Sequence, residues 1–219
     1  MTFDWRYALE VLPKLLSAAG TTVLATLGGM AVALVVGLLF ALLLRVPSVV
    51  VRVPVQFVLE FVRGTPLLIQ LFFLFYVLPV WGIKLDALGT GIVGLGLHYS
   101  TYVAEVYRAG IESIPKGQWE AATSLSLGPG RTWGRIILPQ VVTTVLPMLA
   151  NNLIAMLKDT PLLATITVIE LLGAAMAAAA GSYRYLEVFT LIGVIFLALS
   201  YPAGVMVRRL ERAMQLRKA

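Results

Sequence analysis

The residues best suited to chemistry in this sequence are polar and ionisable side chains that interrupt otherwise apolar segments. His98, Tyr102 and Glu105 recur at i, i+4 and i+7, so they share one face of a helix. Ionisable groups within an apolar span are costly and typically mark the paths of polar solutes. Tyr102 and Glu105 are therefore predicted to line a polar pathway. Two plainer interpretations stay open: hydrogen bonding between helices for His98, and an ion pair with Arg108 for Glu105.

A later apolar segment carries a second group of candidates, Asn151, Lys158 and Asp159. Pro161 follows Asp159 closely, and a polar residue shortly before a proline is typical of a helix start. Lys158 and Asp159 are therefore predicted to flank a break between two helices. The ends of broken helices inside a membrane hold small zwitterions, so these residues join the predicted substrate pathway. The alternative is an interfacial lysine beside a helix cap.

A third candidate site lies where an apolar segment begins. Glu60 and Arg63 are three residues apart and share a helical face, so they can pair with each other or with neighbouring helices. A gating role and a plain interfacial ion pair are equally open. Residues 64–66 (Gly-Thr-Pro) then predict a kinked or broken helix just inside the membrane.

The elements that position these residues are membrane spans. The chain has 219 residues, of which 59% are hydrophobic and 13% charged, and its mean hydropathy is +0.91. This balance lies far from that of a soluble domain. Five uncharged runs reach or approach the roughly 18 to 20 residues that a helix needs to cross a membrane. They are Leu15–Leu44, Gly64–Ile83, Ala87–Ala104, Ile136–Leu157 and Val188–Val207.

The predicted fold class is therefore an all-α integral membrane protein with about five transmembrane helices, forming a single domain over residues 1–219. Residues 171–183, rich in Ala and Gly, are too short to span and fit a buried or interfacial half-helix. Residues 1–14 contain Trp5 and Tyr7 and favour a short interfacial helix over a disordered tail. Gly28, Gly29 and Gly37 predict close helix packing.

Basic residues predict the orientation of the chain. With the N-terminus outside and the C-terminus in the cytoplasm, twelve of the 17 Lys and Arg residues fall on the inner side, as the positive-inside rule requires. The inner set is Arg45, Arg52, Arg63, Arg108, Lys116, Arg131, Arg135, Arg208, Arg209, Arg212, Arg217 and Lys218. The net charge of +6 thus follows membrane topology and does not indicate nucleic-acid binding.

The sequence lacks the motifs of an enzyme. It has no cysteine and a single histidine, so neither a disulfide nor a metal site is expected. Nucleotide-binding P-loops, HExxH, GxSxG and CxxC patterns do not occur. Any energy input must therefore come from a partner through a cytoplasmic surface.

The longest polar interval, residues 107–140, is the natural place for that surface. Residues 117–127 predict a short helix whose apolar Ala121, Ala122, Leu125 and Leu127 gather on one side, with Trp119 near its start. Such a helix can lie partly on its own bundle and partly in the groove of another protein.

This loop resembles the EAA loop of ABC importer permeases. Glu120-Ala121-Ala122 and the later Ile136-x-Leu138-Pro139 match the family pattern, while the family's Gly position is occupied by Ser126. The resemblance implies that residues 108–135 form the coupling loop that inserts into a cleft of an ATPase subunit. The implied coupling residues are Glu120, Ala121, Ala122, Leu125 and Ser126.

Other segments extend the resemblance to the polar amino acid type of these permeases. They are FVRGTPLLIQLFF (61–73), YVAEVYRAGIESIPKGQWEAA (102–122) and MLKDTPLL (156–163). Residues 70–83 and 94–102 are most similar to ectoine and hydroxyectoine permeases, with an ordinary amino acid as the other open substrate.

The resemblance implies a type I importer in the bacterial cytoplasmic (inner) membrane that works by alternating access. The partners would be ATPase subunits that use ATP and Mg, a second permease subunit of the same or a paralogous chain, and an extracytoplasmic solute-binding protein. The solute would be small and polar or zwitterionic, membrane lipid would surround the bundle, and this chain would bind no cofactor itself. An ATPase-independent secondary transporter or channel is the alternative.

Overall fold

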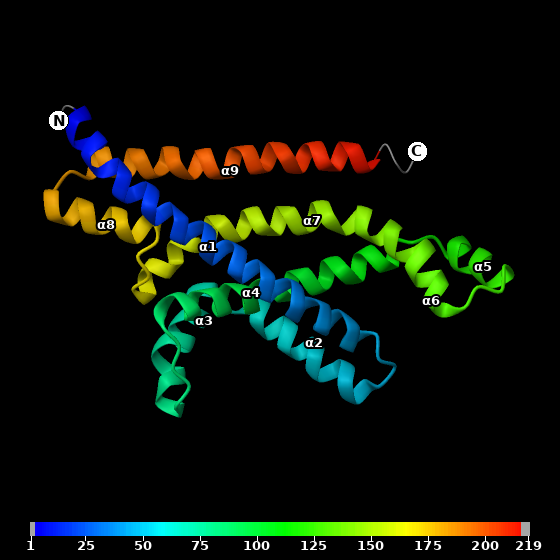
Figure 1. Cartoon of the computed structure of the whole chain (residues 1–219). Coiled ribbons are helices and arrows are strands. Elements are labelled where there is room, and N and C mark those ends of the chain that lie inside the picture. Colours follow the sequence, from blue (N-terminus) through cyan, green and yellow to red (C-terminus); the bar gives the residue numbers. More distant parts are fainter. Residues whose placement is uncertain (1–2, 216–219) are drawn as a thin grey trace.

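The computed structural model describes residues 3–215, which form helices joined by short loops (Figure 1). The N-terminus and α8 lie at one end of the molecule, and α5 lies at the other. The elements are α1 (Trp5–Leu44), α2 (Val49–Gly64), α3 (Leu67–Phe72), the π-helix η1 (Phe73–Val77), the 3₁₀-helix η2 (Leu78–Trp81), α4 (Ala87–Glu112), α5 (Lys116–Ser124), α6 (Pro129–Arg131), the π-helix η3 (Thr132–Ile137), α7 (Leu138–Asp159), the 3₁₀-helix η4 (Thr160–Ile166), α8 (Leu171–Ser182) and α9 (Tyr185–Gln215). Arg217 and Lys218 of the predicted inner charge set lie outside the described residues.

Helix α1 corrects the prediction of a separate interfacial helix over residues 1–14. Of that stretch, residues 5–14 are the first turns of one continuous helix of 40 residues, which is about 60 Å long at 1.5 Å per residue. Pro13 lies inside the helix without ending it. Val11 and Leu15 on either side of it are buried in a hydrophobic cluster with α8 and α9, and this packing continues the helix outward. Residues 1–2 lie outside the described part of the chain.

Three described helices are long and apolar enough to cross a membrane: Trp5–Leu44, Pro129–Ile166 and Tyr185–Met214. The predicted span Gly64–Ile83 is part of a broken pair, since Val49–Gly64 and Leu67–Trp81 meet at 104°. The predicted break at residues 64–66 is thereby confirmed. If this pair is one span, the number rises to four. A count of five, which would add the more polar α4, stays a prediction.

Close helix packing at small residues is confirmed where α1 crosses α4. A Cβ atom built on Gly37 would lie 2.9 Å from the carbonyl oxygen of Ser100, and one on Gly96 would lie 3.1 Å from that of Gly29. Side chains at these positions would push the helices apart. The main hydrophobic cluster forms around this crossing and includes the buried Leu95 and Val103.

The predicted half-helix is α8, which has 12 residues. Glu170, fully buried, caps its N-terminus by accepting hydrogen bonds from the backbone N–H groups of Leu172 (2.9 Å) and Gly173 (2.8 Å). Thr22 of α1 accepts a third, from Leu171 N–H, at 3.1 Å. These bonds satisfy the free N–H groups of the first turn inside the protein.

At the end of the molecule near the N-terminus, Asp4 caps α1 and connects it to the start of α9. Asp4 Oδ1 accepts from the backbone N–H groups of Arg6 (3.0 Å) and Tyr7 (3.1 Å), and its own N–H donates to Glu187 at 3.0 Å. Arg184 pairs with the Asp4 carboxylate at 2.5 Å. The Tyr7 backbone hydrogen bond, together with Arg184, holds the pKa of Asp4 below its usual value.

Candidate functional site

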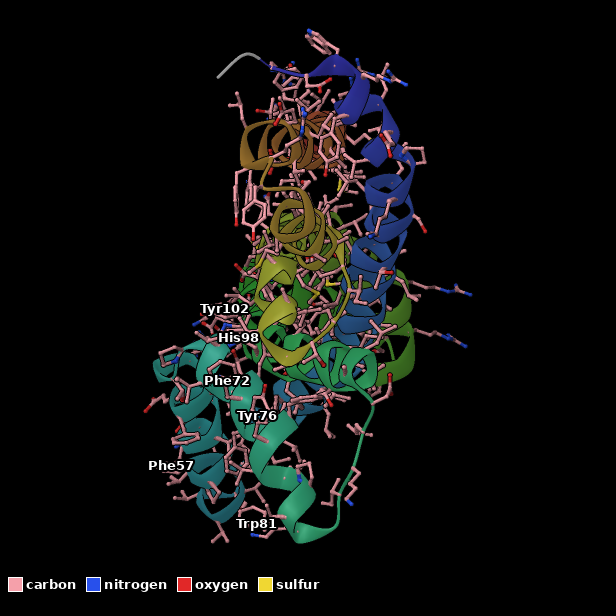
Figure 2. All side chains as sticks on the ribbon, turned by 90° about the vertical axis from the view of Figure 1, so that its left-hand side faces the viewer. Phe57, Phe72, Tyr76, Trp81, His98 and Tyr102 are labelled. Atoms are coloured by element: carbon pink, nitrogen blue, oxygen red, sulfur yellow. The ribbon has the colours of Figure 1, made fainter. Side chains whose placement is uncertain are left out.

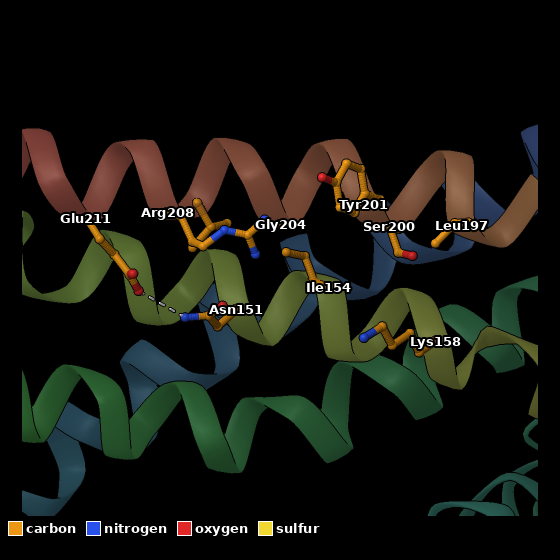
Figure 3. A pocket seen from close by; sticks show the side chains of 10 residues that line it. Asn151, Ile154, Lys158, Leu197, Ser200, Tyr201, Gly204, Arg208 and Glu211 are labelled. Atoms are coloured by element: carbon orange, nitrogen blue, oxygen red, sulfur yellow. Dashed lines mark hydrogen bonds between the residues drawn. The ribbon is translucent and has the colours of Figure 1, made fainter.

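A polar groove of about 390 Å³ runs between α7 and α9 (Figure 3). It brings together two of the predicted pathway residues, Asn151 and Lys158, from one face of α7. Helix α9 supplies the opposite wall. The lining residues are Asn151, Ile154, Lys158, Leu197, Ser200, Tyr201, Gly204, Val207, Arg208 and Glu211.

The chemistry of this groove suits a small solute that carries both charges. Asn151 Nδ2 donates to Glu211 Oε1 at 3.4 Å, which ties the two helices together. Arg208 and Lys158 place positive charge along the groove, and Glu211 places negative charge near one end (Figure 3). Carboxylate and ammonium groups of one molecule can therefore each find an opposite charge here.

Sequence reasoning did not select the α9 side of this groove. Ser200 and Tyr201 carry hydroxyl groups within an apolar span, and this is the one feature of the sequence that could have indicated a polar groove on α9. Arg208 and Glu211 lie in the charged sequence Arg208–Arg212 after the last apolar run, where charges are expected at a membrane surface. Only the packing of α9 against α7 brings them to Asn151.

The other pathway candidates lie elsewhere. Asp159 faces α4 and accepts a hydrogen bond from the hydroxyl of Tyr99 at 2.6 Å. Tyr102, 38% exposed, contacts His98, with ring centroids 5.5 Å apart. The five predicted residues therefore do not converge on one pocket, since neighbouring positions such as 158 and 159 point about 100° apart around a helix.

The predicted helix start beside Asp159 is present, with Pro161 in the first turn of η4, but the predicted break in the backbone is not. Asp159 and Thr160 keep helical backbone angles, and α7 passes directly into the 3₁₀-helix η4. Lys158 therefore lies within a continuous helical segment, Pro129–Ile166. Its place in the groove, and not a helix end, is what can hold a ligand there.

The predicted gating residues line a second cleft, of about 440 Å³, between α2 and α4. Glu60 and Arg63 share it with Glu105, Arg108 and Glu112.

Arg108 forms ion pairs with Glu105 and with Glu112, the latter at 2.7 Å. The plainer interpretation of Glu105 is thus the one that the structure shows. Arg63 turns its Nε–H to the carbonyl of Leu59 at 3.3 Å, within its own helix.

The predicted short helix is α5, and it spans Lys116–Ser124, not 117–127. Its predicted apolar side is divided. Ala122 is buried (1% exposed) and Trp119 packs edge-on against Trp133, whereas Ala121 and Leu125 (71% exposed) face outward. The helix therefore has a side that anchors it and a separate side that is open to a partner.

A tryptophan pair and a cation hold α5 on the bundle. The rings of Trp119 and Trp133 lie 5.3 Å apart at 75°. The guanidinium of Arg45, just after α1, lies 5.3 Å from the Trp133 ring, a cation–π contact. Gln140 of α7 adds a hydrogen bond to Gln118 at 3.3 Å. These contacts connect α5 to the end of α1 and to the start of α7.

Helix α5 is followed by a defined C-terminal cap that includes Ser126. The N–H of Leu127 donates to the carbonyl of Ala122 (3.0 Å), and the N–H of Ser126 donates to that of Thr123 (2.9 Å). This pair of bonds is the Schellman motif, which needs a left-handed residue after the helix and favours glycine there. Ser126 has φ 51°. The turn therefore forms at the family's glycine position although serine occupies it.

A family model for the inner membrane component of binding-protein-dependent transport systems matches residues 33–216. The chain belongs to this family. The match includes α2 to α8, the α5 loop and the groove between α7 and α9. As a member of this family the chain is a membrane transport component, with the all-helical fold described above.

Two relatives of this family member extend over nearly its whole length. The probable amino-acid ABC transporter permease protein y4tG of Sinorhizobium fredii is 43% identical over 202 residues, covering 92% of this chain and 87% of the relative. The glutamine transport system permease protein GlnP of Escherichia coli (strain K12) is 31% identical over 218 residues, covering 99% and 100%.

Solved structures have the same fold. A crystal structure of an amino acid ABC transporter with histidines superimposes with a TM-score of 0.90 at 30% identity, over 97% of this chain and 100% of that one. An inward-facing methionine ABC transporter gives a TM-score of 0.71 at 16% identity. The second likeness concerns the fold alone.

Proposed function

We propose that this family member is the permease subunit of an ATP-binding-cassette importer for amino acids or amino-acid-like solutes. The observation that carries this is the groove between α7 and α9, in which Asn151, Lys158, Arg208 and Glu211 offer both signs of charge. A volume of about 390 Å³ suits a solute the size of an amino acid. The relatives named for amino-acid and glutamine transport support this solute class.

The narrower proposal is a zwitterionic compatible solute such as ectoine or hydroxyectoine, against a polar amino acid. An extracytoplasmic binding protein would deliver the solute, and a second permease subunit would complete the pathway. The N-terminus would lie outside and the C-terminus in the cytoplasm of a bacterial inner membrane, with α5 on the cytoplasmic side.

Energy would enter through α5. Its exposed Glu120, Ala121 and Leu125 would seat in a cleft of a partner ATPase, which binds ATP and Mg itself. The anchored Trp119 and Ala122 would pass the movement to the bundle. Glu60 and Arg63, in the cleft with Glu105, would open and close the inner side.

The coupling step is tested with Glu120→Arg in the reconstituted transporter. The expected result is loss of ATPase docking and of ATP-driven uptake, because the reversed charge opposes a basic partner surface. Glu120→Gln is the matched control and should retain docking. Normal docking and normal uptake by Glu120→Arg would show the coupling assignment to be wrong. ATP-independent uptake by this chain would point instead to a secondary transporter or channel.

The solute is tested at the groove and at the binding protein. Lys158→Gln should reduce uptake while ATPase docking stays intact, and Lys84→Gln, in an exposed loop, should leave uptake unchanged. Titration of the binding protein with ectoine and with amino acids then separates the two solutes. Tight amino-acid binding without ectoine affinity would reject the narrower proposal.

A further inference from the structure

The break between α2 and α3 leaves backbone carbonyls without their regular helical partners. The last four carbonyls of any helix lack regular helical partners. Pro66 supplies no N–H to the carbonyl of Val62, which instead accepts a long bond of 3.4 Å from the N–H of Thr65. Irregular backbone is tolerated inside a membrane only where protein or trapped water satisfies it. Thr65 meets part of this need by donating its hydroxyl to the carbonyl of Phe61.

Gln70 donates two further hydrogen bonds to carbonyls at the break. Its side-chain nitrogen Nε2 lies 2.7 Å from the carbonyl oxygen of Val62 and 2.9 Å from that of Thr65. Carbonyl oxygens only accept, so the atom facing both must be the amide NH₂, and its two protons are both used. The remaining amide atom, Oε1, is therefore an acceptor.

Oε1 of Gln70 lies 3.2 Å from Nδ1 of His98 on α4. Because Oε1 can only accept, Nδ1 must carry a proton in this hydrogen bond. The second nitrogen, Nε2, then carries none in the neutral ring. The geometry thus defines the tautomer of His98 by elimination.

We propose that Gln70 is a positioning residue: its amide closes the backbone break and, through the Nδ1–H of His98, fixes the segment after the break to α4. That segment, Leu67–Trp81, is called the arm here. Leu67 and Leu71 at its root are buried, whereas η1 and η2 bury no residue. Figure 2 shows His98 and Tyr102 beside the root and Trp81 at the far end. Beyond the root, the Tyr76 hydroxyl donates to the carbonyl of Thr165 at 3.4 Å. The Gln70–His98 bond is the shorter of these two polar contacts, and it lies at the root, where the arm leaves the break.

The tautomer can be read directly because His98 is the single histidine of the chain. The full chain is labelled with ¹³C,¹⁵N-histidine, purified with a histidine-free tag and measured by solid-state NMR in lipid bilayers above the histidine pKa. The expected spectrum has one protonated nitrogen, which correlates with Cγ and is therefore Nδ1. A wild-type spectrum with the proton on Nε2 would overturn the proposal.

Variants separate this role from general packing. Gln70→Leu should abolish the Nδ1–H form, whereas Ile69→Leu, at the exposed neighbouring position, should retain it. If the Gln70→Leu protein does not accumulate, Gln70→Asn is measured in its place. The shorter asparagine side chain cannot reach both carbonyls and His98 at once. Retention of Nδ1–H in whichever Gln70 variant is measured would contradict the proposal.

The direction of the arm is measured by spin labels, since the chain has no cysteine of its own. Val50→Cys on α2 and Val80→Cys near the arm's end are 82% and 80% exposed. Labelled chains are diluted with unlabelled ones so that only distances within one chain are recorded. A narrow distance distribution is expected when Gln70 is present, both in the otherwise unchanged chain and in Ile69→Leu. A broadened or shifted distribution is expected for Gln70→Leu or Gln70→Asn. An unchanged distribution would reject the positioning role.

Discussion

The same dipeptide, Thr-Pro, occurs at two helix junctions and gives two different backbone conformations. At Thr65–Pro66 the threonine is extended (φ −104°, ψ 135°) and the chain turns by 104°. At Thr160–Pro161 the threonine is helical (φ −56°, ψ −29°) and α7 continues into η4. Proline disfavours helical backbone angles at the residue before it. Thr65 follows this preference and Thr160 opposes it.

Packing explains the difference. Thr160 is fully buried and its hydroxyl donates to the carbonyl of Leu157 at 2.8 Å. Leu163 and Ile166 beyond it are also fully buried, and each such side chain is worth about 1.5–3 kcal/mol on burial. Asp159 is held by Tyr99. Thr65 is only partly buried, so little opposes its extended conformation.

The largest predicted contrast is between the two prolines. Pro66→Ala removes the restriction on Thr65 and restores an N–H, so α2 and α3 can join into one helix. We expect the spin-label distance between positions 50 and 80 to change and uptake to be lost. Pro161→Ala, where the chain is already helical, should leave both unchanged. Equal behaviour of the two variants would contradict the comparison.

Tyr99→Phe tests what holds the second junction. It removes a hydrogen bond to the Asp159 carboxylate, and hydrogen bonds to charged groups contribute about 1.5–3 kcal/mol. We expect a lower midpoint of thermal unfolding for the transporter in detergent. Tyr102→Phe, whose ring is partly exposed, is the matched control and should change the midpoint little. A midpoint unaffected by Tyr99→Phe would mean that packing alone keeps Thr160 helical.

A smaller effect is predicted for the threonine hydroxyls. Thr160→Val keeps the shape of the side chain but loses a buried hydrogen bond, at a cost of about 1 kcal/mol. Thr65→Val at the partly buried junction should cost less. The two variants are compared by the same thermal unfolding assay. A larger loss of stability for Thr65→Val than for Thr160→Val would contradict the conclusion that the junction at Thr160 is the more tightly held one.

The smallest effect is at a helix end outside both junctions. Ser126 adopts φ 51° at the end of α5, and the left-handed region costs a residue with a Cβ about 1–2 kcal/mol. Ser126→Gly should therefore stabilise the α5 turn slightly, offset in part by the greater freedom of glycine in the unfolded chain. Slower hydrogen exchange at the N–H of Leu127 would support this, and faster exchange would contradict it.

Local sequence signals predicted features that depend on neighbouring residues. The break at residues 64–66, the short helix α8 and the close approach at Gly37 followed from proline, length and small side chains, and the structure confirms them. The α5 helix was found but given an end three residues too late, because Leu125 and Leu127 suggested a continuing apolar side.

The candidate site was predicted only in part. Asn151 and Lys158 stand out as polar groups in a span, but helical periodicity cannot show that Asp159 turns to Tyr99 while Lys158 turns to α9. Arg208 and Glu211 gave no signal, since charged residues near a helix end are ordinary at a membrane surface.

The sequence by itself determined that this is a helical membrane protein, where its chain can bend, and which loop is polar enough to meet a partner. These follow from hydrophobicity, proline geometry and charge, which act over a few residues. The tertiary structure alone decided which Thr-Pro bends, and which polar side chains of α7 and α9 share a groove. The physical reason is that burial against distant helices outweighs the local backbone preference at Thr160 and does not reach Thr65.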